Sequence, residues 1–233
     1  HQDKLEVFES ILAGTREALA FAGARGVSRL LLTGSGAQYG SIPEVHANGI
    51  PENSLIACDA TKTGSAYGEG KRVSEILAAL HAERHGFAVI NARCFAFVGP
   101  GLPLDGHFAI GNFIGDAVAG RPIQLHSGGE AVRSYLYGAD LAVWLLLLLM
   151  EAPHGVTVNV GSNYGVSVLE LAKKVCDLLS PAVSVWPGSS KPENERHFYV
   201  PSINIARGLG LEDWTELDQA IIRTASWHRL ALD

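Results

Sequence analysis

The sequence predicts an α/β fold: a parallel β-sheet with helices on both faces, joined to a smaller and less regular lobe. Short apolar runs alternate with helical patterns of about twelve or more residues, which is typical of strand–helix–strand units. The run Arg29–Gly34 is apolar and ends in glycine, as buried parallel strands do, and similar runs cover 87–93 and 156–160. After about residue 100 this alternation becomes irregular, so we expect a lobe that covers the ligand-binding edge of the sheet.

Helices are expected where apolar side chains recur at helical spacing. The pattern over 5–24 is ended by two glycines, and the pattern over 65–85 has Ile76, Leu77 and Leu80 on its apolar side. Further helices are expected over 109–119, 139–151, 167–179 and 215–230, short strands near 133–137 and 183–186, and irregular stretches over about 35–63, 99–107 and 187–210.

Composition narrows the possible classes of protein. The chain has 233 residues, 47% hydrophobic and 18% charged, which is enough apolar material for a sizeable core. A net charge of −6 argues against binding of a nucleic acid over a broad face. The three cysteines are widely spaced, the first residues are polar, and the apolar run Leu141–Met150 is too short to span a bilayer. We therefore expect a soluble protein of the cytoplasm, with no nucleic acid or membrane partner.

Tyr67 and Lys71 form the sharpest local pattern in the sequence. Positions four residues apart share one helix face, so the phenol and the ammonium project together. A free phenol is a poor base at neutral pH, but a nearby positive charge favours its ionised form. Such a tyrosine can take a proton from a sugar hydroxyl while a hydride leaves the same carbon. A YxxxK spacing by itself also fits an ordinary exposed pair.

Ser35 strengthens the pattern through its position. It lies just beyond the carboxyl end of a predicted parallel strand, where ligands of open α/β sheets bind. A hydroxyl at that point can donate a hydrogen bond to an oxygen that gains negative charge. Without the Tyr67 helix after it, the segment Ser35–Gly40 would be read as a Gly/Ser turn.

Taken together, these segments resemble the extended short-chain dehydrogenase/reductases, also called the NAD-dependent epimerase/dehydratase family. The similarity covers nearly the whole chain, and the ordered set of motifs is far more specific than any one of them. Its members are Gly14-Thr15, Ser35, Tyr39-Gly40, Tyr67, Lys71, Glu75, Arg93, Gly99-Pro100-Gly101, Asn112, Arg133-Ser134-Tyr135 and Asp140-Leu141-Ala142. The resemblance implies a Rossmann-like doubly wound parallel sheet with a smaller α+β substrate-binding lobe.

The resemblance also assigns roles to particular residues. Ser35, Tyr67 and Lys71 would form the catalytic set, with Tyr67 and Lys71 also at the nicotinamide ribose. Asn112, Arg133 and, by a looser match, Arg196 would hold the diphosphate of a nucleoside-diphosphate sugar, a task suited to guanidinium groups. No metal is implied.

The resemblance implies an enzyme, and two departures from the family pattern refine that expectation. No GxxGxxG occurs in these 233 residues, so the chain is expected to lack the family's N-terminal Gly-rich βαβ unit, and binding of NAD or NADP by the chain as given is in doubt. The acidic pair that 4,6-dehydratases carry after the catalytic Ser/Thr is replaced by Gly36 and Ala37. We therefore expect an NAD(P)-dependent nucleotide-sugar epimerase or 4-keto-sugar reductase. The alternatives are a nucleotide-sugar 4,6-dehydratase and a non-catalytic sugar-nucleotide-binding relative.

The expected domain organisation follows from the same resemblance. Residues 1–100, rejoined by about 138–164, would form the remainder of the NAD(P)-binding domain, and 101–137 with 165–233 the substrate lobe. A homodimer is expected through the helices at 5–24 and 65–85, with an apolar seam formed by Leu12, Leu19, Ile76 and Leu80. The sequence leaves open the sugar, the nucleoside, and the choice between NAD and NADP.

Overall fold

The computed structural model describes residues 3–42, 46, 49–106, 108–189 and 198–230. The chain divides into two compact units. The first unit comprises 1–95, 143–160 and 201–212, and the second comprises 96–142, 161–200 and 213–233. The sequence-based division had assigned 201–212 to the lobe. These residues belong instead to the first unit, where Pro201 forms a parallel bridge with Ile50.

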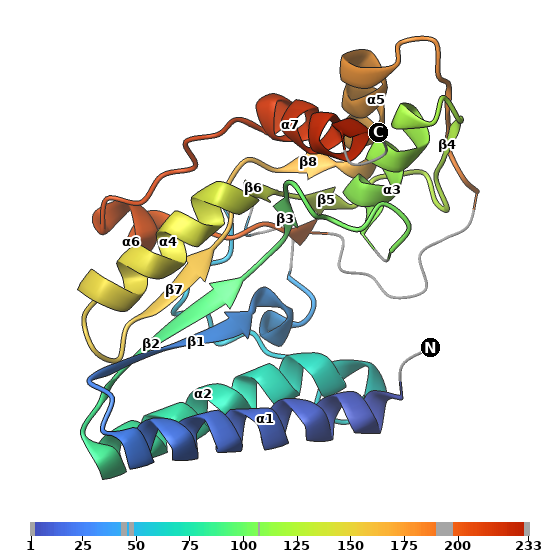
Figure 1. The fold of residues 1–233 in the computed structure, drawn as a ribbon. Helices are drawn as coiled ribbons and strands as arrows, with labels where there is room; N and C mark the ends of the chain where they lie inside the picture. Colours follow the sequence, from blue (N-terminus) through green and yellow to red (C-terminus); the bar gives the residue numbers. More distant parts are fainter. Residues whose placement is uncertain (1–2, 43–45, 47–48, 107, 190–197, 231–233) are drawn as a thin grey trace. The chain divides into compact units, whose positions relative to one another are not determined.

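The first unit is built on a parallel sheet of three strands, in the order β1–β2–β7. These are β1 (Arg29–Ser35), β2 (Ala88–Cys94) and β7 (Thr157–Val160). Both strand pairs are parallel, and the register places Ser35 opposite Cys94. The arrowheads in Figure 1 point the same way, so the carboxyl ends of all three strands meet at one edge. The predicted parallel sheet through these segments is confirmed.

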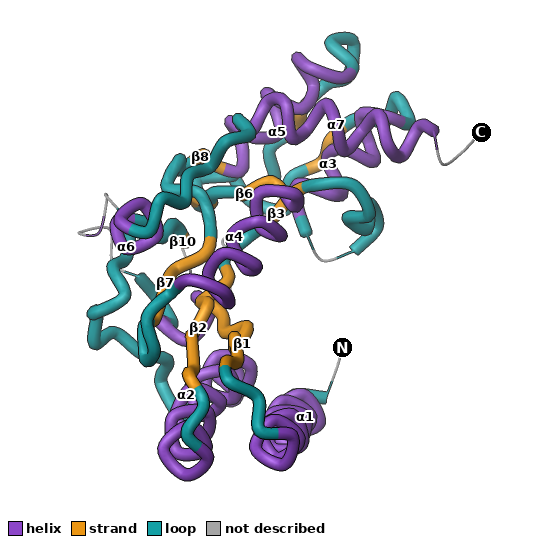
Figure 2. Tube along the Cα trace, turned by 60° about the vertical axis from the view of Figure 1, so that its left-hand side comes forward, coloured by secondary structure: helices purple, strands orange, loops and turns teal. Residues whose placement is uncertain are grey.

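Helices cover both sides of this sheet, which gives the doubly wound arrangement. Helices α1 (Lys4–Arg25) and α2 (Ala66–His85) lie together along one side, and α4 (Gly138–Glu151) lies along the other (Figures 1 and 2). Helix α1 begins at an Asp3 side chain that accepts a hydrogen bond from the Leu5 amide. It ends at Gly26, which adopts the left-handed conformation that favours glycine.

The contact between α1 and α2 differs from the sequence-based expectation. The buried residues of α2 are small, including Gly70, Ser74 and Ala78, and this allows close packing of the two helices. Leu77 packs against the core of the first unit, as expected for the helix's apolar side, but Ile76 and Leu80 are 61% and 56% exposed. The hydrophobic pattern could not reveal this, because small residues contribute little to it although they mark the packed face.

The second unit surrounds its own hydrophobic core with three helices and short strands. Helices α3 (Ala109–Val118), α5 (Val168–Leu179) and α7 (Leu217–Leu230) contribute most of that core. The strands are β3 (Phe97–Val98), β4 (Ile123–Gln124), β5 (Val132–Arg133), β6 (Leu136–Tyr137), β8 (Val166–Ser167), β9 (Val185–Trp186) and β10 (Phe198–Tyr199). The mixture of helices and small sheets confirms the expected α+β character.

Two short 3₁₀ turns lie close to the first sheet. Strand β1 runs directly into a 3₁₀ turn, η1 (Gly36–Tyr39), and a second turn, η3 (Thr63–Ser65), leads into α2. Helix α6 (Asn204–Gly208) lies in the stretch that was expected to be irregular. No helix in the described part of the chain combines the length and the apolar character that a membrane crossing requires.

Candidate active site

Ser35 lies where the sequence predicted it, as the last residue of β1. It is buried, and its hydroxyl accepts a hydrogen bond from the Ala37 amide (3.1 Å), so that it begins the η1 turn. An extended backbone at Ser35 followed by this turn fixes the direction of the hydroxyl. The serine is therefore held by the local backbone at the carboxyl edge of the sheet.

Tyr67 and Lys71 lie in the first turns of α2. The Lys71 ammonium donates a hydrogen bond to the carbonyl oxygen of Thr33 (3.0 Å), two residues before Ser35 on the same strand. The Tyr67 side chain is 45% exposed and makes no hydrogen bond within the described residues. The structure thus brings Lys71 to the end of β1 that carries Ser35. That the Ser35 and Tyr67 hydroxyls reach one shared point stays a prediction.

Gly68 explains how closely this part of α2 approaches the η1 turn. A Cβ atom at Gly68 would lie 2.7 Å from the carbonyl oxygen of Ala37 and 2.6 Å from the sulfur of Cys58. Both distances are shorter than real Cβ contacts, so only glycine fits without a shift of the backbone. The residue beside Tyr67 therefore packs directly on the turn that follows Ser35.

A network of buried polar side chains lies next to this site. Arg93 donates two parallel hydrogen bonds to the Glu75 carboxylate, from Nε to Oε1 (2.9 Å) and from Nη2 to Oε2 (2.8 Å). Gln38 Nε2 also donates to Glu75 Oε1 (2.8 Å), and Arg93 Nη1 donates to the Tyr39 hydroxyl (2.6 Å). We call this network, with Glu52 and Asn159, the Arg93 cluster.

The Arg93 cluster also joins β7 and the loop at Glu52. The Tyr39 hydroxyl donates to Asn159 Oδ1 (2.9 Å), and the Asn159 amide donates to the Glu52 carboxylate (2.9 Å). The Asn159 side chain further donates to the carbonyl oxygen of Ile50 (2.8 Å). These hydrogen bonds thus connect segments that are far apart in the sequence, near the carboxyl edge of the sheet.

Burial and charge shift several ionisation equilibria in this region. Burial alone would lower the pKa of Arg93, but the adjacent Glu75 carboxylate raises this pKa above its ordinary value, so the guanidinium stays charged. Burial raises the pKa of Glu52 and of Tyr39. Burial also raises the pKa of the Cys94 thiol to about 11, with Lys71 acting in the opposite direction. Cys94 is therefore a neutral thiol at pH 7 and a poor nucleophile.

The residues expected to bind substrate phosphates lie in the second unit. Asn112 lines a cavity of about 480 Å³, and its buried Oδ1 has no hydrogen-bond partner among the described residues. Arg133 does not line this cavity. It donates to the carbonyl oxygen of its neighbour Val132 (2.8 Å) and lies over the Tyr199 ring. Arg196 lies outside the described residues.

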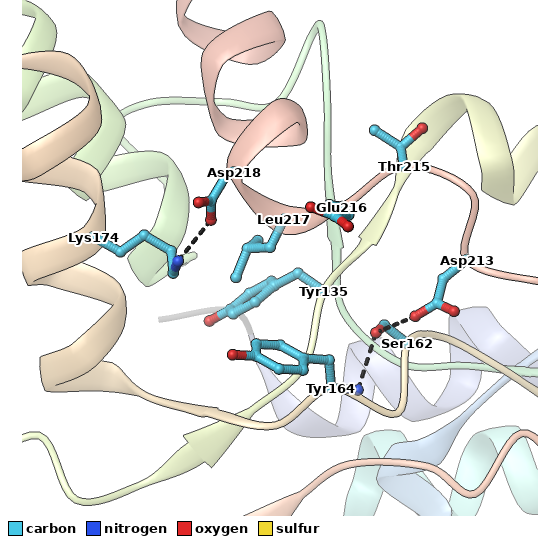
Figure 3. A pocket seen from close by; sticks show the side chains of 9 residues that line it. All are labelled: Tyr135, Ser162, Tyr164, Lys174, Asp213, Thr215, Glu216, Leu217 and Asp218. Atoms are coloured by element: carbon cyan, nitrogen blue, oxygen red, sulfur yellow. Dashed lines mark hydrogen bonds and ion pairs between the residues drawn. The ribbon is translucent and has the colours of Figure 1, made fainter.

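A second cavity of the same unit, of about 430 Å³, has an acidic lining (Figure 3). Lys174 contributes an ammonium group to the lining, and this group is paired with Asp218 (2.6 Å). Ser162 donates a hydrogen bond to Asp213 (2.7 Å). Burial raises the pKa of Tyr135, which also lines the cavity, to about 12. Carboxylates outnumber the ammonium here, so this cavity is a poor place for a diphosphate.

Sequence reasoning missed three members of the Arg93 cluster: Gln38, Glu52 and Asn159. Asn159 gave a usable signal, since it is a polar residue between two valines in a predicted buried strand. Such a residue must find hydrogen-bond partners inside the protein. Gln38 and Glu52 gave no comparable signal, because their partners, Glu75 on α2 and Asn159 on β7, are distant in the sequence.

The donor groups decide which kind of cofactor the site can hold. No cluster of three or more His, Cys, Asp or Glu side chains suited to a metal ion occurs in the described ranges. Lys71 has ammonium protons beyond the one on Thr33, and Tyr67 is exposed beside it, so ribose hydroxyls fit these two side chains. The 233 residues contain no Gly-rich phosphate-binding turn for the pyrophosphate of a dinucleotide.

Two plant proteins have sequences similar to this chain. UDP-glucuronic acid decarboxylase 3 of Arabidopsis thaliana is 29% identical over 230 residues, covering 98% of this chain and 66% of that protein. UDP-glucuronic acid decarboxylase 5 of the same plant is 30% identical over 218 residues, covering 93% and 62%. The chain thus spans somewhat less than two thirds of the length of these relatives.

Solved structures show the same fold. The UDP-glucose 4-epimerase of Thermotoga maritima, determined with UDP-glucose, superposes with a TM-score of 0.87 at 21% identity, covering 100% of this chain and 73% of that one. The UDP-glucose 4-epimerase of Thermus thermophilus, determined with NAD, gives 0.81 at 22% identity, covering 95% and 70%. Residues 1–161 match the NAD dependent epimerase/dehydratase family. The chain belongs to the NAD-dependent epimerase/dehydratase family.

Proposed function

We propose that this chain forms the catalytic part of an NAD(P)-dependent enzyme that acts on a nucleoside-diphosphate sugar, as an epimerase or a 4-keto-sugar reductase. One observation carries the proposal: the Lys71 ammonium lies at Thr33, on the strand that ends in Ser35, with Tyr67 one helical turn away. Binding alone has no need of a paired phenol and ammonium at this edge.

Each of the three side chains has a distinct task in this proposal. Tyr67 accepts a proton from the sugar hydroxyl during oxidation and returns one during reduction. Ser35 donates a hydrogen bond to the same sugar oxygen and orients it. Lys71 favours the ionised form of the phenol and donates hydrogen bonds to the nicotinamide ribose. When bound, NAD(P) supplies the hydride acceptor for the sugar carbon.

The second unit supplies candidate substrate contacts. The unpartnered Asn112 carbonyl oxygen would accept a hydrogen bond from the nucleotide, and the cavity around it has room for a nucleoside. Arg133 would pair with the diphosphate, since guanidinium and phosphate match in charge and geometry. Arg196 is proposed for the same task on the sequence resemblance alone.

The relatives favour a second candidate, decarboxylation of a nucleoside-diphosphate uronic acid. The two plant relatives, which are 29% and 30% identical to this chain, are named UDP-glucuronic acid decarboxylases. Oxidation at C4 of a glucuronic acid creates a β-keto acid, which loses carbon dioxide readily. The same tyrosine, serine and lysine would serve this reaction. A 4,6-dehydratase is less well supported, because Gly36 and Ala37 offer no acid to the C6 hydroxyl.

We further propose that a Gly-rich strand–turn–helix unit pairs with the free edge of β1 and supplies the pyrophosphate site. Among the described residues β1 pairs with β2 alone, and its leucines are only partly buried. Nearby, α4 exposes Leu146 and Met150, which are 59% and 63% accessible. A parallel sheet is normally covered at such an edge. The non-catalytic alternative predicts that no such unit exists.

A homodimer through α1 and α2 remains a proposal, with one correction to its seam. Leu19 is 1% exposed and packs in the first unit's own core, so it cannot form the seam. Ile76, Leu80 and Phe21 are more than half exposed on these helices and are better candidates. Light scattering at micromolar concentration tests this, and a monomer would contradict it. We also propose a reducing, cytoplasmic location, in keeping with three cysteines that form no disulfide.

Product analysis tests the proposed function. The protein that carries this chain is incubated with UDP-glucose or UDP-glucuronic acid and NAD⁺, and separately with a UDP-4-keto sugar and NADPH or NADH, and the products are analysed by mass spectrometry and NMR. An epimer of unchanged mass, or reduction of the keto sugar, supports the first candidate, and loss of carbon dioxide supports the second. Loss of water would indicate a dehydratase. Tight binding of the nucleotide sugars with no turnover in any of these mixtures would support the non-catalytic relative and contradict the proposal.

A further inference from the structure

We propose that Glu75 is a positioning residue: it holds Tyr67 and Lys71 in place relative to Ser35. The inference rests on the proposed function and deepens it, because Glu75 itself does not touch a substrate or cofactor in this account. It acts through the helix and through the turn after Ser35.

The spacing along α2 places Glu75 on the same stripe as the two reactive side chains. Tyr67, Lys71 and Glu75 are separated by four residues each, so they follow one another along one face of the helix. A displacement or rotation of the helix at Glu75 therefore displaces Lys71 and Tyr67 in the same sense. Contacts that fix the position of Glu75 therefore also fix the helical turns that carry Tyr67 and Lys71.

Glu75 is held at both of its carboxylate oxygens. Both oxygens accept hydrogen bonds from the guanidinium of Arg93, in the bidentate arrangement that restricts orientation as well as distance. Both side chains are largely buried, at 14% and 15% exposure. Since Arg93 belongs to β2, this pair ties α2 directly to the sheet.

Gln38 supplies the second connection. Its side-chain amide donates to the same Glu75 oxygen that accepts from Arg93 Nε. Gln38 lies in the η1 turn, three residues after Ser35, and is buried. One carboxylate thus joins the helix of Tyr67 and Lys71 to the turn that starts at Ser35. The two halves of the candidate site come from separate segments, and Glu75 is bonded to both.

The consequence concerns the distance between Lys71 and Tyr67 on one side and Ser35 on the other. In Glu75→Gln one of the two accepting oxygens becomes an amide NH₂ group, so the paired bonds from Arg93 and the bond from Gln38 cannot all be kept. The helix is then held less firmly against the sheet and the η1 turn. A misplacement of about 1 Å costs about 10²-fold in rate.

The variant Glu75→Gln tests the proposal, with Glu83→Gln as the matched control. Glu83 is an exposed glutamate of the same helix, so the same chemical change is made without loss of a cluster contact. We expect kcat per folded molecule to fall about 10²-fold in Glu75→Gln, with KM for the nucleotide sugar changed by less than about 3-fold. The control should match the wild type.

Two further variants keep the outcome decisive. Gln38→Met removes one connection and leaves the Glu75–Arg93 pair intact, so it should fold normally and lower kcat by about 10-fold. The NMR signals of the Tyr67 ring, assigned with Tyr67→Phe, need no turnover and should shift in Glu75→Gln but not in Glu83→Gln. Reduced stability with unchanged kcat per folded molecule, or unchanged Tyr67 ring signals, would overturn the proposal. A wild-type protein without turnover would contradict the proposed function, while the Tyr67 ring signals would still decide the role of Glu75.

Discussion

Two neighbouring parts of α2 differ sharply in their environment. The first turns carry Tyr67, which is 45% exposed and makes no hydrogen bond among the described residues, and Lys71, which has one bond to a backbone carbonyl. One turn later, Glu75 is largely buried and accepts three hydrogen bonds. The same helix face thus passes from an open, sparsely bonded region to a closed, densely bonded region.

This difference indicates a division of labour. Groups that exchange protons with a substrate need unused hydrogen-bonding capacity and access to solvent or ligand. Groups that hold them in place need the opposite, namely burial and complete pairing, because an unsatisfied buried charge is costly. The Arg93 cluster therefore supports the Tyr67 region and is not itself a second reactive site.

The largest effect on stability should come from Arg93→Ala. This change leaves the buried Glu75 carboxylate without its partner, so the free energy of unfolding should fall by about 3–5 kcal/mol. Urea denaturation measures this value. The control Arg121→Ala breaks an exposed ion pair with Asp116 and should cost less than about 1 kcal/mol. Equal losses in the two variants would show that the cluster is not a stabilising support.

Arg133→Ala should act on binding and leave the Arg93 cluster unaffected. The variant should weaken nucleotide-sugar affinity by about 1.5–3 kcal/mol, the range of a charge-assisted hydrogen bond. Calorimetry measures this change, and Arg229→Ala, at an exposed position of α7, is the control. Wild-type affinity in Arg133→Ala would remove Arg133 from the proposed phosphate site.

Gly68→Ala tests how closely the open region packs on the η1 turn. The added methyl would meet the Ala37 carbonyl and the Cys58 sulfur, so we expect a loss of about 1–3 kcal/mol from overpacking. Gly14→Ala, in α1, adds a methyl that meets no atom within 4 Å and should stabilise the helix by about 0.5–1 kcal/mol. Thermal or urea unfolding compares the two. Effects of the same sign would contradict the close approach.

The smallest effect concerns Glu52 at the margin of the cluster. Burial raises the pKa of Glu52, so between its ordinary and its raised pKa the folded state binds more protons than the unfolded state. Stability therefore falls as pH rises through that window, and Glu52→Gln should remove this fall. The difference at pH 7 should stay below about 1 kcal/mol, because solvent screens a partly exposed charge. Unfolding at pH 4 and pH 7 measures it, and an identical pH dependence in wild type and variant would contradict the assignment.

Much of the open region could be predicted from the sequence, because its signals are local. The strand before Ser35 and the helix of Tyr67 and Lys71 are set by short apolar runs and helical spacing, and the structure has them within one residue of the expected bounds. The short strands were harder to predict from the sequence. The strand expected near 133–137 is two strands, β5 and β6, which pair with different partners.

The closed region depends on contacts that no local pattern encodes. Glu75 and Arg93 were visible as motif members, but their pairing follows from the packing of α2 against β2. Gln38 and Glu52 lie in a segment that reads as a polar loop, and their partners lie on helix α2 and strand β7. The exposed positions of Ile76 and Leu80 likewise followed from small residues on the packed face, which hydrophobic periodicity overlooks.

The most direct test of the account is the turnover of Tyr67→Phe in the protein that carries this chain. The ring and its packing stay, and only the proton-transferring hydroxyl is lost. With NAD⁺ and the accepted nucleotide sugar, the account predicts that the rate falls by about 10²–10⁴-fold while the affinity for the nucleotide sugar stays nearly unchanged. Turnover of Tyr67→Phe at the wild-type rate would contradict the proposed mechanism.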